Sequence, residues 1–415
     1  MNILVINAGS SSLKYKFFDM NGSRVMAEGM AERIGEPESV LTHRNIADKG
    51  HETARIQAGI RDHRDAMLLM EKLLTDPAIG VIHTVSEIAG IGHRVVQGGE
   101  AFREAVCITD AVKLSIRENN PLAPLHNPAN LVGIDVAQEL FKGIPNVAVF
   151  DTQFHQTMPP KAFMYGLPYD CYTRLKIRRY GFHGTSHNYV SREAAKLMGK
   201  PVHDLCLITI HLGNGCSIAA VKYGQCIDTS MGMTPLSGVM MGTRTGDIDP
   251  AIVGYLLEQT GMSLRELDDV LNRQSGLKGI SGSNDMRDIH ARVDQGDPRA
   301  ALALDMFTYQ VKKYIGSYAA ALGHLDAVVF TAGIGENDAR TRSLICQNLL
   351  SVGIELDPSE NIAARPGPFA IHSGRSRVQV WVIPTNEELQ IAKETEAILK
   401  NALHNGKKTD MPAMG

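Results

Sequence analysis

One pattern occurs twice in this chain of 415 residues: a short apolar run, a turn of glycine and small polar residues, and two further strands. The first copy has its apolar run at residues 3–6 and its turn at 7–12, and the second has them at 205–210 and 211–215. A short apolar run that ends at turn residues is typical of a buried strand. The repetition therefore predicts an α/β fold built from two related halves.

The strands after each turn are marked by alternating apolar and polar residues. In the first copy we expect them at 13–18 and, after the Asn21-Gly22 hairpin signal, at 24–29. In the second copy we expect them at 216–221 and 225–228. Each half thus begins with a three-stranded antiparallel meander.

Helices and buried strands complete the two halves. Ala66, Met70 and Leu73 share a face of one predicted helix, and residues 127–140 form another. Predicted buried strands are 147–150, 326–331 and 378–383.

Two helix starts and one helix end can be read from local signals. Ser263 and Glu266 have capping-box spacing, and Asp297 precedes a proline that suits the first helical position. The last helix is expected to run to about Leu403, and the polar tail 405–415 is expected to fray.

Composition limits the partners of the chain. Its length exceeds the roughly 250 to 300 residues at which single cores stop growing, so two domains are expected. Lys and Arg number 42 against 45 Asp and Glu, which argues against nucleic acid or a membrane as partner. Six cysteines without a C-x-x-C pair suit reduced thiols. We expect a cytoplasmic protein that acts on a small ligand.

Arg244 lies in a glycine-rich segment, 238–250, that ends in Asp247 and Asp249. With no large side chain beside it, its guanidinium can form a bidentate pair with a carboxylate or phosphate. Arg94, beside Gly98 and Gly99, repeats the arrangement. The alternative is that each is a solvated turn arginine.

Three glycine-rich turns, at residues 7–12, 211–215 and 333–337, offer unobstructed backbone N–H groups of the kind that hold phosphate oxygens. A structural role for such glycines is the competing interpretation. None of the turns is a P-loop, and the third lacks the last glycine of a dinucleotide fingerprint.

Histidines and acids supply the remaining polar groups. His126 and His183 can donate hydrogen bonds to an anion, although either could be a satisfied structural histidine. His183 and His187 also have the i, i+4 spacing of zinc ligands, but the glycine between them argues against a firm helix. Asp151 and Glu387 close strands and, with Asn7, could hold a hydrated magnesium ion, unless the acids act as helix N-caps.

With these segments in place, the sequence resembles the acetokinase family of the actin, sugar kinase and heat-shock-chaperone ATPase superfamily over nearly its whole length. The resemblance is carried by residues 7–14, 92–96, 123–128, 179–187, 211–215, 228–235, the Arg244 segment, 333–337 and 385–389. One departure is Gln97, where the family commonly has histidine, and we expect it to have at most a tuning effect.

The resemblance implies two duplicated ribonuclease H-like (actin-like ATPase) domains flanking a cleft. The first is expected to comprise residues 1–150 plus 388–415, and the second, which binds the nucleotide, residues 151–387. It also implies a homodimer. The implied reaction is reversible transfer of the ATP γ-phosphoryl group to acetate, giving acetyl phosphate and ADP, with Mg²⁺, or alternatively Mn²⁺, as cofactor.

The resemblance also assigns roles to individual residues. Asp151, His183 and Arg244 are the expected catalytic residues, and Asn7 and Glu387 the expected metal ligands. The expected substrate contacts are Arg94, Val96, Leu125, His126, Phe182 and Pro235. The expected nucleotide contacts are Ser12, Lys14, His211, Leu212, Gly213, Asn214, Gly215, Asp285, Met286, Arg287, Gly333, Ile334, Gly335, Glu336 and Asn337.

Three questions remain open at the level of sequence. Because a carboxylic acid is already ionised at neutral pH, Asp151 is expected to orient Arg94 or a metal-bound water rather than to act as a base. Val96 is smaller than leucine but larger than the alanine that the resemblance associates with propionate-preferring relatives, so it implies acetate as the substrate, and a propionate or short-chain acyl kinase is the alternative. An actin-like ATPase binding module is the rival of a different class.

Overall fold

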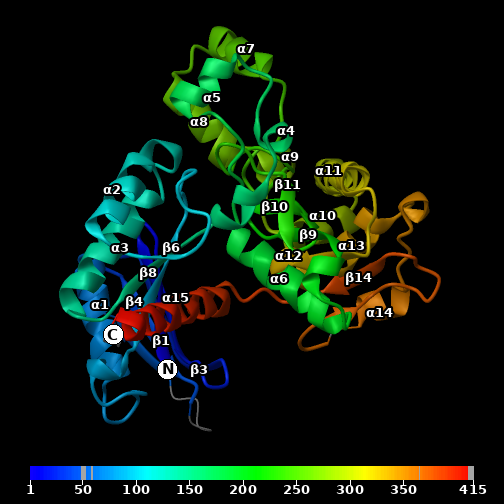
Figure 1. Ribbon diagram of the computed structural model, residues 1–415. Coiled ribbons are helices and arrows are strands. Elements are labelled where there is room, and N and C mark those ends of the chain that lie inside the picture. Colours follow the sequence, from blue (N-terminus) through cyan, green and yellow to red (C-terminus); the bar gives the residue numbers. More distant parts are fainter. Residues whose placement is uncertain (48–52, 58, 364, 410–415) are drawn as a thin grey trace. The chain divides into compact units, whose positions relative to one another are not determined.

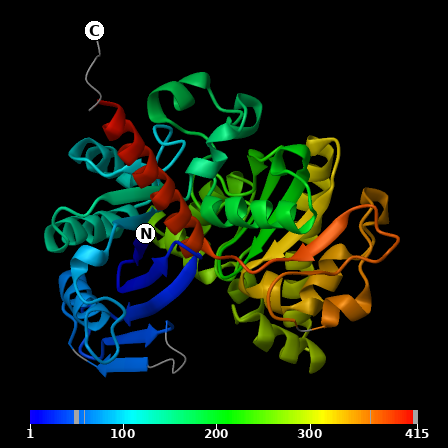
Figure 2. The same cartoon turned by 60° about the horizontal axis from the view of Figure 1, so that its bottom comes forward.

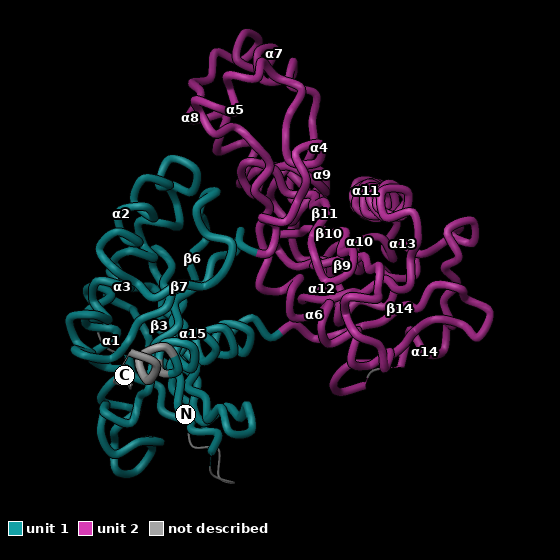
Figure 3. The backbone as a smooth tube through the Cα atoms, in the orientation of Figure 1, with its two compact units in different colours: residues 1–153, 386–415 teal, residues 154–385 magenta. Residues whose placement is uncertain are grey.

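The computed structural model describes residues 1–47, 53–57, 59–363 and 365–409, without the side chains at 403 and 405–409. The chain forms two compact units, residues 1–153 with 386–415 (unit 1) and residues 154–385 (unit 2), shown in Figure 3. Asp151 and Glu387, expected at the two ends of the second domain, both belong to unit 1. No helix in the described part of the chain has the length and apolar character needed to cross a membrane.

Unit 1 contains an eight-stranded sheet in the order β5-β4-β3-β2-β1-β6-β8-β7. Strands β1, β6 and β8 run parallel, and all other neighbours pair antiparallel. The strands are β1 (Asn2–Ala8), β2 (Ser12–Asp19), β3 (Arg24–Glu32), β4 (Val40–Asn45), β5 (Thr53–Gln57), β6 (Gly90–Val95), β7 (Val106–Cys107) and β8 (Asn146–Phe150).

Unit 2 contains a six-stranded sheet in the order β11-β10-β9-β12-β14-β13, in which β9, β12 and β14 run parallel. The strands are β9 (Cys206–Leu212), β10 (Cys216–Lys222), β11 (Gln225–Thr229), β12 (Ala327–Thr331), β13 (Phe369–Ala370) and β14 (Gln379–Val382). Six strands of unit 1, β3-β2-β1-β6-β8-β7, have the same order and directions. The expected duplication of an α/β half is confirmed.

The period of two in a strand explains how unit 1 builds two cores. Leu4 and Ile6 of β1 face helices α1 (His63–Leu74) and α3 (Asn127–Leu140), whereas Ile3 and Val5 face α15 (Glu387–Thr409). Helix α15, red in Figures 1 and 2, lies against β1, β6 and β8.

Glycines in β6 let α15 approach the sheet. A Cβ atom at Gly90 would lie 2.4 Å from Leu399 Cδ1, and one at Gly92 would lie 2.4 Å from Thr395 Oγ1. Any larger residue at either position would push the helix away, so the packing requires glycine here.

Two helices cover the sheet of unit 2. Helix α6 (Gly184–Leu197) packs on β9 and β12 through Val190 and Ala194, and the long helix α11 (Pro298–Leu322) packs on β9 and β10. The other helices are α2 (Asp110–Glu118), α4 (Pro160–Phe163), α5 (Tyr169–Leu175), α7 (Ala251–Thr260), α8 (Leu264–Asp269), α9 (Gly276–Ser281), α10 (Met286–Asp294), α12 (Ala332–Asn337), α13 (Ala339–Cys346) and α14 (Pro358–Ile362).

The structure confirms most local expectations and corrects three. The capping box of Ser263 and Glu266 and the N-cap of Asp297 are both formed. Residues 333–337 are not an open turn, because helix α12 begins directly after β12. Helix α15 continues through the start of the expected frayed tail to Thr409, while the rest of that tail, 410–415, lies outside the described residues.

The third correction concerns the two histidines at i, i+4. Gly184 does not weaken a helix there, because it is the first residue of α6 and His183 is the N-cap. His183 has a left-handed backbone (φ 56°), which ends the preceding segment and points the chain into the helix.

Candidate active site

Three parallel strands of unit 1 deliver the first group of polar residues to one sheet edge. Asn7 lies near the end of β1, Arg94 near the end of β6, and Asp151 directly after β8, and these strands are neighbours. Ligands of α/β proteins bind at the carboxyl ends of such strands.

Arg94 and Asp151 form a two-point ion pair. Arg94 Nε donates to Asp151 Oδ1 at 2.9 Å, and Nη2 donates to Oδ2 at 2.6 Å. Burial works against the charge of Arg94, but Asp151 outweighs it and raises the pKa of the guanidinium. The carboxylate therefore fixes the plane of the guanidinium, and Asp151 does not cap a helix.

Glu387, the first residue of α15, is half-buried, and its carboxyl group interacts electrostatically with Arg94 and Asp151. Its burial, together with Asp151 and Glu388 nearby, raises its pKa despite the opposing effect of Arg94. Its side chain has no hydrogen bond or ion pair with any described residue, and the helix is capped instead by Asn386, which accepts from Leu389 N at 3.1 Å. A half-buried carboxylate without a hydrogen-bond partner, beside a second carboxylate, is suited to a cation.

The side chain of Asn7 likewise has no hydrogen bond within the described part of the chain. The Asn7 amide oxygen and the Glu387 carboxylate are therefore available at this edge, near the Asp151 carboxylate that holds Arg94. This donor set fits a hydrated Mg²⁺ ion, which takes only one or two carboxylates and keeps several waters. The described residues contain no group of three or more His, Cys, Asp or Glu side chains that could hold a metal ion by themselves.

Lys14 lies opposite Asn7 in the neighbouring strand β2 and pairs with Glu388. Lys16 adds a second contact to Glu388 at 3.6 Å. Burial opposes ionisation of Glu388, but the two lysines lower its pKa below the ordinary value. Ser12, at the start of β2, lies beside Gly9, whose added Cβ would meet Ser12 Oγ at 2.8 Å.

In unit 2, the imidazole rings of His183 and His211 are stacked, with their centres 4.1 Å apart. His183 Nδ1 and Ser217 Oγ are hydrogen-bonded at 2.8 Å, and His211 Nδ1 and Ser186 Oγ at 2.9 Å. Each ring is therefore held on one edge by a serine.

Gly215 brings His183 and Arg244 to the same point. A Cβ atom added to Gly215 would lie 3.4 Å from His183 Nε2 and 3.5 Å from Arg244 Nη1. The absence of a side chain there leaves room in front of both groups, so the turn at 213–215 and the two cationic or donor side chains form one local site within unit 2.

Arg244 is not neutralised by an acid. Its Nη1 donates to Pro235 O at 3.2 Å and contacts Met241 Sδ at 3.8 Å, and it forms no ion pair with a described residue. Burial lowers its pKa, with only Cys216 opposing. An arginine in a protein nevertheless stays protonated, so a positive charge faces this site.

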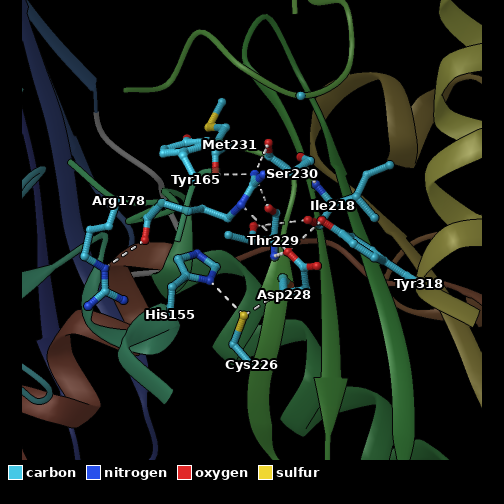
Figure 4. Close-up of polar contacts among 12 residues, drawn as sticks. His155, Tyr165, Arg178, Ile218, Cys226, Asp228, Thr229, Ser230, Met231 and Tyr318 are labelled. Atoms are coloured by element: carbon cyan, nitrogen blue, oxygen red, sulfur yellow. Dashed lines mark hydrogen bonds and ion pairs between the residues drawn. The ribbon is translucent and has the colours of Figure 1, made fainter. Parts of the chain in front are cut away.

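Arg179 holds the loop that follows β11 and leads to the Arg244 segment. Its Nη1 donates to the carbonyl oxygens of Thr229, Ser230 and Met231 at 2.7, 2.9 and 3.2 Å, at the end of β11 (Figure 4). Asp247 closes the Arg244 segment on itself by accepting from Gly238 N, at the segment's first residue, at 2.8 Å, and it also accepts from the Tyr314 hydroxyl.

The expected nucleotide residues differ in what surrounds them. His211 and Leu212 end β9, and Gly213 donates to Gly215 O across the turn at 3.1 Å. Asn214 contacts both Gly242 and Asn284. These residues cluster in unit 2 near His183 and Arg244.

A second set follows β12 and begins α10. Gly333 has open space where a side chain would stand, and Gly335 and Ile334 lie within the short helix α12. Asn337 donates to Gly333 O. Glu336 accepts from Ala332 N and Thr385 N at 2.8 and 3.0 Å. Its carboxylate therefore joins the start of α12 to the segment after β14 within unit 2.

At the start of α10, Asp285 caps the helix and pairs with the exposed Arg287, while Met286 is buried. The guanidinium of Arg287 therefore faces solvent, whereas Met286 contributes to the core.

The expected acyl wall is divided between the two units. In unit 1, Val96 is buried and Leu125 is exposed, and His126 is the N-cap residue of α3. In unit 2, Phe182 is buried and Pro235 is partly exposed. The expected wall residues of unit 1 belong to the same unit as Arg94, and those of unit 2 to the same unit as Arg244.

Gln97, the departure from the family pattern, is fully buried in unit 1. Its Oε1 accepts from Gly99 N at 2.9 Å, and its backbone pairs with Asn127. The amide Nε2 is buried with no hydrogen-bond partner among the described residues.

Sequence reasoning missed the residues that hold the site together. Glu388, Arg179, Ser217 and His187 received no role, although all four belong to or border the polar segments already singled out. The i, i+4 histidine pair was the available signal for His187, but it was weighed only as a zinc motif.

Both units have the strand order of the actin-like ATPase fold, and in unit 2 an arginine and a histidine converge on the glycine turn at 213–215. This combination defines a phosphotransferase of the actin-like class. Residues 2–393 match the acetokinase family, and the chain belongs to that family.

Relatives agree over their full lengths. The chain is 55% identical over 401 residues to the acetate kinase of Oleidesulfovibrio alaskensis, covering 96% of this chain and 100% of that one. It is 51% identical to the acetate kinase of Thermotoga maritima, covering 96% and 99%.

Solved structures give the same result. The acetate kinase of Porphyromonas gingivalis superposes with a TM-score of 0.91 at 43% identity, covering 96% of this chain and 99% of that one. A propionate kinase from Francisella tularensis superposes with a TM-score of 0.89 at 41% identity, with the same coverage.

Proposed function

We propose that the chain catalyses reversible, magnesium-dependent transfer of the ATP γ-phosphoryl group to acetate, giving acetyl phosphate and ADP. The observation that carries the proposal is the site in unit 2 where Arg244 and His183 meet at Gly215 without a neutralising acid. The transferring phosphoryl group spreads negative charge over its oxygens, and positioned donors are the main source of catalysis in this chemistry.

Acetate oxygen attacks the γ-phosphorus in line, and ADP leaves with the electron pair of the broken P–O bond. Because acetate is already ionised at neutral pH, the reaction needs no general base. The two-point pair between Arg94 and Asp151 supports a positioning role for Asp151: the carboxylate holds the guanidinium that binds the acetate carboxylate.

Glu387 and Asn7 are the residues that would hold the metal in unit 1, and Asp151, which interacts electrostatically with Glu387, would orient a water on it. When bound, Mg²⁺ neutralises charge on the nucleotide phosphates. The proposed nucleotide contacts are those of unit 2 at 211–215, 285–287 and 333–337, together with Ser12 and Lys14 of unit 1. Unit 2 is accordingly the proposed nucleotide domain.

Acetate is the proposed acceptor because Val96 leaves less room than alanine would. One methylene in an apolar pocket is worth about 1 to 3 kcal/mol, so propionate should react more weakly. Comparing kcat/KM for acetate, propionate and butyrate tests this, and a preference for propionate would reassign the chain to the longer acid.

The decisive assay is ATP with hydroxylamine as an acyl trap, with and without acetate. Hydroxamate that forms only with acetate supports the kinase. ADP release that is independent of acetate would instead support an ATPase that uses nucleotide to change conformation.

We also propose a homodimer in the cytoplasm, through the surface of α7 and α8. Helix α7 is apolar yet has no buried residue, and Ile252, Tyr255 and Leu264 are exposed. Large exposed apolar side chains in a cluster mark interaction surfaces. Light scattering should give a dimer for the wild type and a monomer for Tyr255→Glu, and a monomeric wild type at micromolar concentration would contradict the proposal.

A further inference from the structure

A chain of hydrogen bonds leads from the core of unit 2 to the ring of His183. Thr209 Oγ1 and His187 Nδ1 are 2.7 Å apart, His187 Nε2 and Ser217 Oγ are 2.7 Å apart, and Ser217 Oγ and His183 Nδ1 are 2.8 Å apart. Thr209, His187 and Ser217 are each essentially inaccessible to solvent. Every proton in the chain must therefore be placed on a protein acceptor.

Ser217 forces its two histidine partners into opposite roles. Its hydroxyl has one proton, so it can donate to only one of the two ring nitrogens. If both nitrogens donated to it, its own proton would be buried without an acceptor. One histidine therefore donates to Ser217, and the other accepts from it.

Thr209 decides the direction. If His187 Nδ1 donated to Thr209, the threonine hydroxyl proton would need another acceptor, and no other hydrogen bond of this hydroxyl is formed with the described residues. In the opposite direction, Thr209 donates to His187 Nδ1 and every donor is satisfied. An unsatisfied buried donor is costly, so the second arrangement is preferred.

The direction then propagates to the site. His187 is neutral, because burial, with His155 and His211 nearby, lowers its pKa well below the ordinary value. With Nδ1 accepting from Thr209, its single proton is on Nε2 and is donated to Ser217. Ser217 donates to His183 Nδ1, which leaves the proton of a neutral His183 on Nε2.

We infer that Thr209, His187 and Ser217 are positioning residues that fix His183 as the neutral tautomer with its proton on Nε2. In this form His183 presents an N–H donor at Gly215, beside the Arg244 guanidinium. A second proton on His183, at Nδ1, would make Ser217 accept from both histidines and leave the buried proton of its hydroxyl without an acceptor. The inference rests on the proposed function only for the use of that donor, which is to bind an oxygen of the transferring phosphoryl group.

The first test is the site of the proton in the whole wild-type enzyme. Nitrogen NMR of histidine-labelled protein at pH 7.5 separates protonated from unprotonated ring nitrogens, and the His183→Gln spectrum assigns the His183 signals. We expect the proton on Nε2 in both His183 and His187. A proton on Nδ1 of either ring, or on both nitrogens of His183, would overturn the inference.

The second test asks whether Thr209 sets the tautomer of His183 through the hydrogen bonds of His187 and Ser217. Thr209→Val keeps the shape of the residue but removes its donor, so both histidines should become mixtures of the two tautomers. Thr209→Ser keeps the hydroxyl and should restore the wild-type spectrum. Thr308→Val, at a buried threonine of α11 that bonds only to its own helix, is the matched control and should change neither ring.

Kinetics and a double mutant complete the test. Thr209→Val should lower kcat about fivefold while KM for ATP and acetate stays within twofold. Thr209 itself contacts no substrate, and its loss weakens only the His183 donor that acts on the transferring phosphoryl group. In a Ser217→Ala background, Thr209→Val should no longer alter His183. If Thr209→Val changed the tautomer of His187 but not that of His183 while Ser217 is intact, the proposed effect of Thr209 on His183 would be disproved, even if acetyl phosphate formation were normal. Conversely, an enzyme without acetate-dependent activity but with the expected tautomers would sink the proposed function alone.

Discussion

Arg94 and Arg244 are both half-buried arginines near glycines, yet their surroundings are opposite in charge. Arg94 in unit 1 is held by both oxygens of Asp151, with Glu387 and Glu388 also acting on it. Arg244 in unit 2 contacts a carbonyl oxygen and a sulfur atom, and no described acid pairs with it. The same residue type thus serves as an oriented part of an acid-rich site in one unit and as an uncompensated charge in the other.

The comparison divides the chemistry. The site in unit 1 has an excess of carboxylates, which suits a cation, and its fixed Arg94 is the proposed partner of the acetate carboxylate. Unit 2 offers excess positive charge, which suits phosphate oxygens. Four substitutions can break or sharpen this division.

The largest effect is expected at Arg244. Arg244→Gln should lower kcat about 1,000-fold, as for other arginines that stabilise phosphoryl transfer. The free energy of unfolding should change little, because no buried acid loses a partner. Steady-state kinetics and urea unfolding measure both, with Arg375→Gln, at an exposed arginine paired with Glu355, as the control. If kcat fell by less than tenfold, the proposal that the uncompensated charge of Arg244 stabilises phosphoryl transfer would be refuted.

Asp151→Asn should act through Arg94. We expect kcat/KM for acetate to fall about 100-fold and the free energy of unfolding to fall by about 3 kcal/mol, since a buried pair loses one charge. The control is Asp135→Asn, at a surface acid of unit 1 that pairs with Lys113. Near-normal turnover with unchanged magnesium affinity would refute both roles suggested for Asp151.

Glu387→Gln should weaken the metal rather than the arginine. The half-saturating magnesium concentration should rise about tenfold, with kcat largely recovered at saturating metal. Glu396→Gln, farther along α15 and paired with Lys400, should leave the magnesium titration unchanged. An unchanged titration for Glu387→Gln itself would place the metal elsewhere.

The smallest effect is expected at Val96. Val96→Ala removes bulk beside Arg94 and should shift the ratio of kcat/KM for propionate over acetate upward by about tenfold. Competition between the two acids in one reaction measures the ratio directly. No shift would mean that this side chain does not contact the acyl group.

The sequence predicted the strands well because apolar runs and turn residues coincide in them. The β1 and β9 copies, the hairpins after them and helix α3 are all where the pattern indicated. Strands β4 and β5 were not foreseen, because they are short and contain few large apolar residues. Helix α12 was misjudged because its glycines resemble a turn, although β12 passes directly into it.

For the site, sequence could name the residues that face a ligand but not those behind them. Glycine beside arginine is visible in a linear chain. The bonds from Thr209 through His187 and Ser217 to His183 join β9, α6 and β10, which become neighbours only in the folded unit. The left-handed backbone of His183 likewise depends on tertiary structure rather than on local propensity.

Helix α15 has a consequence for the order in which the molecule matures during translation. It closes one core of unit 1 with Ile391, Ala392 and Leu399, although the rest of that unit is encoded before residue 154. Unit 2 is continuous in sequence and can fold as soon as it leaves the ribosome. The first domain to be synthesised is therefore the last to be finished, and it acquires Glu387 in the same event that completes its packing.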